Sequence, residues 1–433
     1  MVVMSWGLLG PEKLDGTRRT RTLGLGAAVR AFNDLAVPGL GGVWFGKQLF
    51  LAVLGVAVAE QVRNSGGQAA NIATANAVEA LACWLALDSS GWQSDSRLRG
   101  ASKMQGNEDL AFAKVSQRSF YVTQPMRMRT VQPLLALGLV TSNSQRFSGF
   151  SCSEQGYAFI EEACSKSNPC YYSKSVLDHL ADWANKKPVN VKLEKLRTAL
   201  SPLEPLPTRA REILRERLVQ GSGDASRRRA ALAWVENLRK SWPDSIAWDF
   251  KPDSLTDEHW KDLRAGAKFF LAREAAIALL DQTESQMANQ SEPRLPLDSE
   301  LSKALVQAIQ SLQQRCQAFL DENHDPTQLA SEFCRECVNA NTPAIVLERL
   351  VKRDDRVLRL RGRQVVPGPA YRGASTPQPD EPADPEEESP KPADQYDIPW
   401  PEGISERIKS LYWLNLDLHG ELSETGTSDE VNP

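Results

Sequence analysis

The chain has 433 residues, of which 41% are hydrophobic and 24% are charged, a composition typical of a globular protein with two or three domains. Its formal charge of -4 hides an uneven distribution: residues 365–433 carry 15 acidic and 4 basic side chains, which leaves 40 acidic and 47 basic side chains, a net charge of +7, in the first 364 residues. Seven cysteines at irregular spacing argue against a disulfide framework and predict a reducing, cytoplasmic location.

Residues 1–73 predict an N-terminal arm followed by a buried helix. The arm carries Arg18, Arg19 and Arg21, and it lacks the apolar segment of a secretion signal. The apolar run from Leu49 to Ala59 is much shorter than the roughly 20 residues that cross a bilayer. We therefore expect a buried helix there and no contact with a membrane.

A glycine-rich stretch precedes that helix. Gly41-Gly-Val-Trp-Phe-Gly46-Lys47 has the glycine and lysine spacing of a phosphate-binding loop. However, Gln48 replaces the Ser or Thr that would bind magnesium, and bulky side chains fill the loop. Nucleotide binding at Lys47 is therefore the least favoured of three functional hypotheses, and we predict no cofactor and no catalytic residue.

The order of elements between Tyr121 and Glu162 is the most informative pattern in the chain. Apolar residues from Met128 to Leu137 predict one helix that ends at Gly138, and the next residues, to Cys152, predict a β-hairpin around a polar loop. Ser153 then starts a further helix. This order resembles the winged-helix family, in which a recognition helix precedes a β-hairpin wing. The resemblance predicts a winged-helix domain of three helices and a wing at residues 74–200, including a helical extension.

Winged helices place the recognition helix in the major groove and the wing against the DNA backbone. If the apolar residues face the core, Arg129 points outward and is the best candidate for a groove contact. Pro133 is expected to kink this helix, and the wing has no cation before Arg146, so backbone contacts are favoured over base reading. The DNA-contact candidates in this segment are Arg127, Arg129, Thr130, Gln132 and Arg146.

Pro202, Pro205 and Pro207 predict a domain boundary, after which helical periodicity indicates a helical-bundle domain at residues 208–365. Two basic runs lie within it. Arg227, Arg228 and Arg229 open a helix, where they either contact a phosphate or form a solvated face paired with acidic residues. The second run is either a nucleic-acid contact strip or a surface onto which the acidic tail folds; its members are Arg349, Lys352, Arg353, Arg356, Arg359, Arg361 and Arg363.

Cys334 and Cys337 have metal-ligand spacing on a predicted helix. A structural zinc site needs two further ligands, and no second pair with that spacing is present. Buried helical thiols are the favoured interpretation, and we predict no metal.

The end of the chain changes in composition. Residues 366–395 are rich in proline and acidic residues and predict a disordered linker. Residues 396–420 regain apolar residues and predict a docking helix, with Tyr396–Leu418 able to pack on this chain or on a partner. Residues 421–433 are expected to form a disordered tail.

Together these patterns predict a mainly α-helical protein: a winged-helix domain, a helical-bundle domain and an acidic disordered linker. The preferred function is a non-enzymatic DNA-binding subunit or regulator of a bacterial multiprotein system, with antiviral defence or a mobile element as the hypothetical context. Expected partners are double-stranded DNA and a protein bound through Tyr396–Leu418 or the helical domain, and a homodimer is compatible with the pattern. The alternative is a structural or assembly subunit whose winged helix binds protein.

Overall fold

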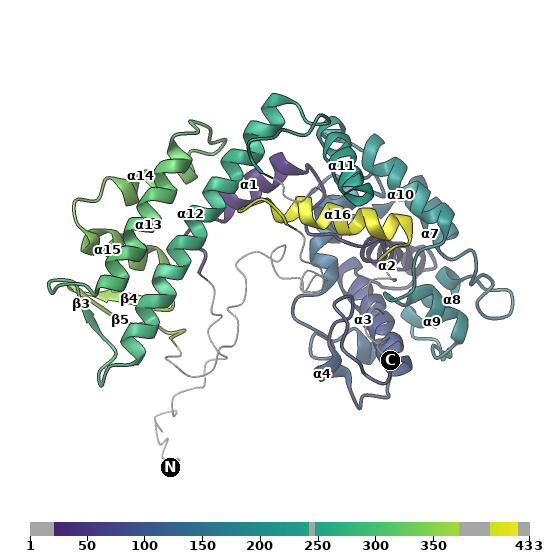
Figure 1. Cartoon of the computed structure of the whole chain (residues 1–433). Helices are drawn as coiled ribbons and strands as arrows, with labels where there is room; N and C mark the ends of the chain where they lie inside the picture. The colour runs from purple at the N-terminus through teal and green to yellow at the C-terminus, as the bar shows by residue number, and fades with distance from the viewer. Residues whose placement is uncertain (1–20, 242–246, 372–398, 423–433) are drawn as a thin grey trace, which may run out of the picture. The chain divides into compact units, whose positions relative to one another are not determined.

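The computed structural model describes residues 21–241, 247–371 and 399–422, and this part of the chain is mainly α-helical with a few short strands (Figure 1). The predicted fold class is thus confirmed at this level. The chain forms two compact units, which we call the large unit (residues 30–267 and 385–433) and the small unit (residues 1–29 and 268–384). This division differs from the predicted boundary, because residues 202–207 lie inside the large unit and the division falls within a long helix, α12 (Asp257–Ala288).

The large unit holds most of the helices. Its elements are the second part of α1 (Gly26–Ala36), α2 (Gly46–Asn64), α3 (Asn71–Ser89), α4 (Ala101–Met104), α5 (Phe112–Val115), η1 (Met126–Arg129), α6 (Val131–Ala136), β1 (Val140–Thr141), η2 (Phe147–Gly149), β2 (Ser151–Cys152), α7 (Glu154–Ala163), α8 (Val176–Ala184), α9 (Glu194–Leu200), α10 (Thr208–Gln220), α11 (Ala225–Lys240), the first part of α12 (Asp257–Ala288) and α16 (Glu406–His419).

Helices α2 and α3 form the centre of the large unit. Both are apolar around most of their circumference, as expected of helices covered on all sides, and nearly every residue of each is buried. They approach closely at Gly55, where a Cβ atom would lie 2.4 Å from the Cα atom of Ala75. The predicted buried helix at Leu49–Ala59 is confirmed. Among the helices of the described residues, none is both long and apolar enough to cross a membrane.

The small unit combines helices with an antiparallel sheet. Its elements are the first part of α1, the second part of α12, β3 (Leu295–Pro296), α13 (Lys303–Leu320), α14 (Leu329–Val338), α15 (Pro343–Asp354), β4 (Leu358–Arg361) and β5 (Gln364–Pro367). The sheet has the order β3-β5-β4, with Leu295 opposite Val365 and Arg361 opposite Gln364. The alternation of Val and Leu with Arg at Arg356–Val366 predicts a strand or a hairpin arm, and this segment contains β4 and most of β5.

Two predicted boundaries change around this unit. Arg21 does not belong to a solvated basic arm: its guanidinium is buried and forms ion pairs with Asp281, Glu284 and Asp354. Such pairing offsets the cost of burying the charge. The acidic linker also starts later than predicted, because Val366 belongs to β5. Arg18, Arg19, linker residues 372–395 and residues 423–433 lie outside the described residues.

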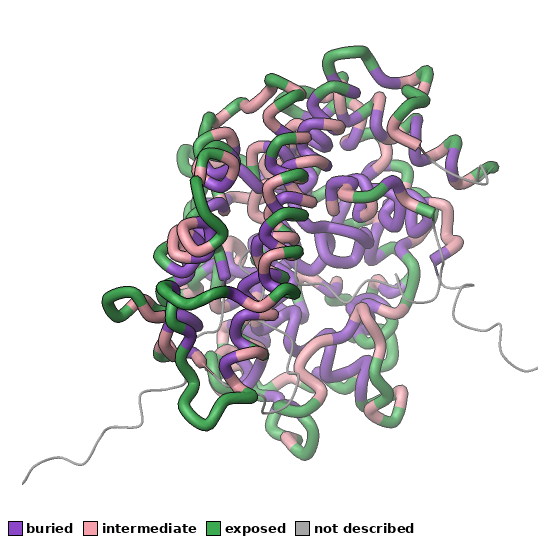
Figure 2. Tube along the Cα trace, turned by 60° about the vertical axis from the view of Figure 1, so that its left-hand side comes forward, coloured by how far each residue is buried: buried purple, intermediate pink, exposed green. Residues whose placement is uncertain are grey.

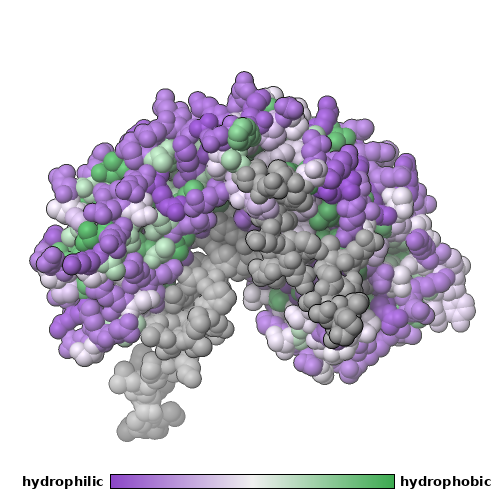
Figure 3. Space-filling model, in the orientation of Figure 1, coloured by the Kyte–Doolittle hydropathy of each residue, from purple (hydrophilic) through white to green (hydrophobic). Residues whose placement is uncertain are grey.

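Burial follows the helical period. Several helices change between buried and exposed within each turn (Figure 2), which is the pattern of amphipathic helices packed on a core. The face shown in Figure 3 is mainly hydrophilic, with its hydrophobic residues scattered among polar ones. Scattered apolar residues of this kind are normal for a protein surface and do not by themselves indicate a binding site.

Candidate nucleic-acid interface

The segment expected to form one recognition helix consists of two short helical pieces. Residues 126–129 form the 3-10 helix η1, and α6 begins anew at Val131. A buried carboxylate of α3 holds η1 in place: Glu79 accepts hydrogen bonds from the backbone N–H groups of Met126 (2.7 Å) and Arg127 (2.9 Å). Tyr121 donates a third, at 2.9 Å. Burial raises the pKa of Glu79, while these donors act in the opposite direction.

Arg129 does not point outward as predicted. It is 5% exposed, and its backbone carbonyl lies so close to Gly41 that a Cβ atom there would be 2.6 Å from the oxygen. The prediction was wrong because it continued one helical phase through Thr130, where the structure changes from a 3-10 turn to a new α-helix. Pro133 therefore lies in the first turn of α6, where a missing N–H group costs no hydrogen bond, and it does not kink a longer helix.

The other candidates in this segment are also used within the large unit. Arg127 is buried, donates to Asn76 Oδ1 (2.7 Å) and stacks over the ring of Phe147. Thr130 is fully buried and donates to the carbonyl oxygen of Arg127. Gln132 donates to Asp34 of α1 and accepts a hydrogen bond from Arg407 of α16. These side chains bind elements of their own chain and do not form an open DNA-contact surface.

The wing region keeps one exposed candidate. Strands β1 and β2 pair antiparallel, with Val140 opposite Cys152, and Ser153 caps α7 by accepting from the N–H group of Gly156. The expected order of helix, hairpin and helix is thus present. Arg146 lies exposed in the loop between the strands, just before η2.

The basic start of α11 mainly stabilises the large unit. Arg227 forms ion pairs with Asp262, Asp224 and Glu258. Arg228 is 1% exposed and donates to three backbone carbonyl groups, at Leu218, Pro38 and Ser222. Arg229 is exposed and donates to the carbonyl oxygen of Val219. The sequence left open whether this run contacts a phosphate or pairs with groups of its own chain. Arg227 and Arg228 pair with acidic side chains and backbone carbonyl groups of the large unit.

The loop before α2 does not have the geometry of a phosphate-binding loop. The N–H group of Gly46 donates to Asp417 of α16 at 2.7 Å, and Gln48 Oε1 accepts from the N–H group of Trp44 at 2.9 Å. Lys47 is buried and donates to the carbonyl oxygen of Ala199. Burial lowers the pKa of Lys47 to about 8. The groups that would hold a phosphate are already bonded within the protein.

The predicted docking helix packs on this chain. Helix α16 contacts α2, α10 and α11 in the large unit, and Ile408, Leu411, Trp413 and Leu414 are buried there. Arg407 is also buried, and it forms an ion pair with Asp34. The apolar face of α16 is therefore covered by its own chain, which is the first of the two alternatives expected for this helix.

The cysteine pair of α14 is buried, as expected. Cys334 and Cys337 lie beside a third thiol that sequence reasoning did not connect with them, Cys316 of α13. A hydrogen bond with Cys334 raises the pKa of Cys316. A search of the described residues for three or more His, Cys, Asp or Glu side chains arranged to hold a metal ion finds no such group.

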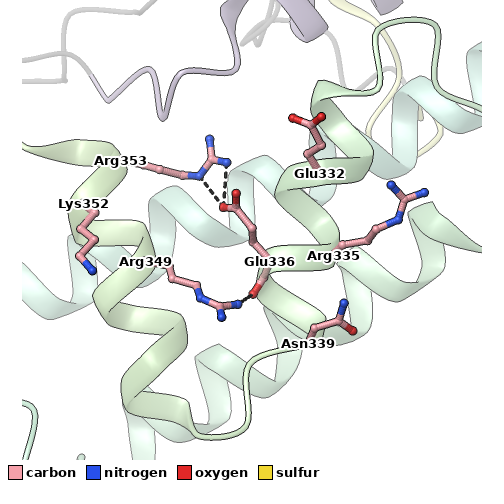
Figure 4. Close-up of a pocket in the computed structure, with 7 residues that line it drawn as sticks. All are labelled: Glu332, Arg335, Glu336, Asn339, Arg349, Lys352 and Arg353. Atoms are coloured by element: carbon pink, nitrogen blue, oxygen red, sulfur yellow. Dashed lines mark hydrogen bonds and ion pairs between the residues drawn. The ribbon is translucent and has the colours of Figure 1, made fainter.

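The small unit contains an open basic hollow between α14 and α15, with a volume of about 820 Å³ (Figure 4). We call it the basic hollow and define it by seven lining residues: Glu332, Arg335, Glu336, Asn339, Arg349, Lys352 and Arg353. Four cations and two carboxylates give it a formal charge of +2. Three of these cations belong to the second basic run recognised in the sequence.

The cations of the basic hollow differ in how firmly they are held. Figure 4 shows Arg349 and Arg353 pointing from α15 toward Glu336 on α14. Arg353 donates to the Glu336 carboxylate at 2.8 and 2.9 Å, and Arg349 donates to the backbone carbonyl of Glu336. Lys352 is exposed and pairs with Glu348 one turn away, at 2.8 Å. Arg335 is exposed, and its guanidinium has no hydrogen-bond or ion-pair partner within the described part of the chain.

Sequence reasoning missed the contribution of α14 to this hollow. Arg335 and Asn339 are four residues apart and therefore share one face of a helix, a signal that the sequence contains. Within this helix, the sequence patterns singled out only Cys334 and Cys337 as candidate functional residues. The meeting of α14 with α15 was not predicted.

No family model matches the chain, and no curated protein or solved structure matches it either.

Proposed function

We propose that this chain is a non-enzymatic DNA-binding subunit that contacts the phosphate backbone of duplex DNA through the basic hollow of the small unit. The observation that carries the proposal is the convergence of four cations on one open hollow, including the exposed Arg335, which has no partner among the described residues. Guanidinium groups suit phosphate oxygens because they donate in a planar fork.

The basic residues that neighbour the basic hollow in the sequence also support DNA binding. Residues 349–363 carry seven cations and two acidic residues, and one of the latter, Asp354, is buried against Arg21. On β4 the exposed Arg359 and Arg361 alternate with Leu358 and Leu360, so both arginines lie on the outer face of the strand. A positive surface of this kind attracts polyanions over a range set by the ionic strength.

This proposal moves the DNA contact away from the predicted recognition helix. Arg127, Arg129 and Thr130 are buried, and Gln132 is held by Asp34 and Arg407. The order of α6, β1, β2 and α7 supports a winged-helix-like arrangement of this region, which we include in the proposal as a packing module. The same intrachain contacts favour the second candidate function, an assembly subunit in which this module serves protein packing and no DNA is bound.

The test is the affinity of the full chain for a fluorescently labelled DNA duplex, measured by fluorescence anisotropy. The double variant Arg335→Ala/Lys352→Ala should weaken binding about tenfold or more, because both side chains are exposed cations of the hollow. Arg118→Ala is the matched control: this exposed arginine of the large unit has no partner among the described residues, and its loss should change affinity by less than about twofold.

Two results would contradict the proposal. Unchanged affinity in the double variant would exclude the basic hollow as the contact surface, and a large loss in Arg146→Ala alone would assign the contact to the wing. No measurable binding by the unaltered chain near physiological salt would favour the assembly subunit.

A further inference from the structure

In the small unit, the described residues that follow β5 lie close to the C-terminal end of α15, next to the basic hollow. After β5, the N–H group of Gly368 donates to the carbonyl oxygen of Val357, and that of Ala370 donates to Arg356, each at 2.9 Å. Arg356 lies two residues after the end of α15, the helix that supplies Arg349, Lys352 and Arg353 to the hollow. The path of the chain after Tyr371 therefore starts from the end of that helix.

A dense acidic segment follows shortly afterwards in the sequence. Residues 380–388, which lie outside the described residues, contain six carboxylates and no cation. These are Asp380, Glu381, Asp384, Glu386, Glu387 and Glu388. We call residues 380–388 the acidic segment.

The chain between Tyr371 and the acidic segment is long enough for the segment to reach the basic hollow. Eight residues lie between Tyr371 and Asp380, so the two Cα atoms can be at most about 30 Å apart when the chain is extended. The 12 residues of α15 are about 18 Å long. All the hollow's cations on α15 are thus within reach of the acidic segment. Because the acidic segment and the hollow belong to one chain and are close in sequence, their encounter is intramolecular, with an effective concentration on the order of millimolar.

The charges match as well. The hollow's four cations exceed its two carboxylates, and both Arg335 and Lys352 are exposed to an incoming anion. Arg335 has no acidic partner among the described residues, so a carboxylate bound there replaces only water. We propose that the acidic segment of this chain binds the basic hollow and competes there with DNA. The competition rests on the proposed function, whereas the binding of the segment does not.

Zero-length cross-linking tests the binding without DNA. A water-soluble carbodiimide joins a lysine amine to a carboxylate as an amide, with loss of water to the reagent, only where the two groups touch. Lys352 is the one lysine that lines the hollow as described, and Lys303 of α13 is an exposed lysine of the same unit that serves as the internal control. We expect monomeric full-length protein to yield Lys352 peptides joined to residues 380–388, in at least about tenfold excess over Lys303 peptides.

Two variants make this result decisive. Lys352→Arg keeps the charge but removes the amine, so the cross-link should disappear while the fold is preserved. Changing the six carboxylates to their amides should also abolish it. Equal yields at Lys352 and Lys303, or cross-links found in dimers alone, would overturn the proposal.

DNA affinity then tests the competition. The amide variant should bind duplex DNA about tenfold more tightly than the unaltered chain, and adding Arg335→Ala/Lys352→Ala should remove that gain. The cross-link without any DNA binding would refute the proposed function and leave the docking intact. DNA binding without the cross-link would refute the docking and leave the proposed function intact.

Discussion

The close approach of α2 and α3 predicts opposite effects for the same substitution at two helical glycines. Both Gly55 and Gly266 are buried in helix interiors of the large unit. Replacing glycine by alanine in a helix interior stabilises it by about 1 kcal/mol when the methyl group fits. A Cβ atom at Gly266 would come no closer than 3.3 Å to Phe32, a contact that requires Phe32 to move by only a few tenths of an ångström.

At Gly55, a small movement of a neighbouring side chain cannot relieve the contact. There the Cβ atom would lie 2.4 Å from the Cα atom and 2.6 Å from the Cβ atom of Ala75, so the two helices must separate. Overpacking of this kind costs about 1–3 kcal/mol, which exceeds the gain in helix propensity. We therefore expect Gly55→Ala to be less stable than Gly266→Ala by about 2 kcal/mol. Additional removal of the Ala75 methyl group should restore little, because the closest atom belongs to the backbone.

Urea unfolding of the two variants, followed by tryptophan fluorescence, measures this difference. An equal or higher unfolding midpoint for Gly55→Ala would refute the close packing of α2 and α3. The m value should stay unchanged, which would show that the variants differ in stability and not in the surface exposed on unfolding.

Three further predictions concern buried groups of the large unit. Glu79→Ala leaves the N–H groups of Met126 and Arg127 without their acceptor, so the free energy of unfolding should fall by about 2–6 kcal/mol, and unchanged thermal unfolding would show that Glu79 does not anchor η1. Trp413→Ala should cost about 3–5 kcal/mol because Trp413 is 1% exposed in α16; a stable variant would mean that α16 is not part of the core. Lys47 has a folded-state pKa near 8, below its usual 10.5, so the unfolded chain binds more protons between these values. The stability of the unaltered protein relative to Lys47→Met should therefore rise by up to about 3 kcal/mol from pH 8 to 10.5, and parallel stability curves would contradict the burial of this charge.

Local patterns in the sequence predicted the helices well where the environment is uniform. The run at Leu49–Ala59 is apolar on all sides, and α2 is covered on all sides. Ser153 caps α7 as its position suggests, and the alternation around Arg359 and Arg361 predicted a strand, which is β4. These features depend on residues within a few positions of one another.

The segment expected to form the recognition helix could not be predicted correctly from local sequence patterns. Its helical pattern breaks at Thr130, and the start of η1 is held by Glu79, more than 40 residues earlier, which accepts hydrogen bonds from the N–H groups of Met126 and Arg127. The burial of Arg21 has a similar origin, because its partners Asp281, Glu284 and Asp354 lie far along the chain. Neither contact produces a periodic pattern of residues in the sequence from which it could be predicted.

The candidate site was predicted in part for the same reason. The cations of α15 were visible as a basic run, but Arg335 gains its role through the packing of α14 against α15. Conversely, Arg228 belongs to an arginine cluster in the sequence, yet it donates to the backbone carbonyls of Pro38, Leu218 and Ser222. A cluster of cations in the sequence therefore does not distinguish a phosphate-binding surface from a buried hydrogen-bond network.

The salt dependence of DNA binding tests the central claim most directly. The logarithm of the binding constant falls linearly with the logarithm of the salt concentration, and each lost phosphate contact reduces the slope by about one. The account predicts that Arg335→Ala/Lys352→Ala lowers the slope by about two, while Arg118→Ala and Arg146→Ala leave it unchanged. An unchanged slope in the double variant, with a lower slope in Arg146→Ala, would contradict the assignment of the DNA contact to the basic hollow.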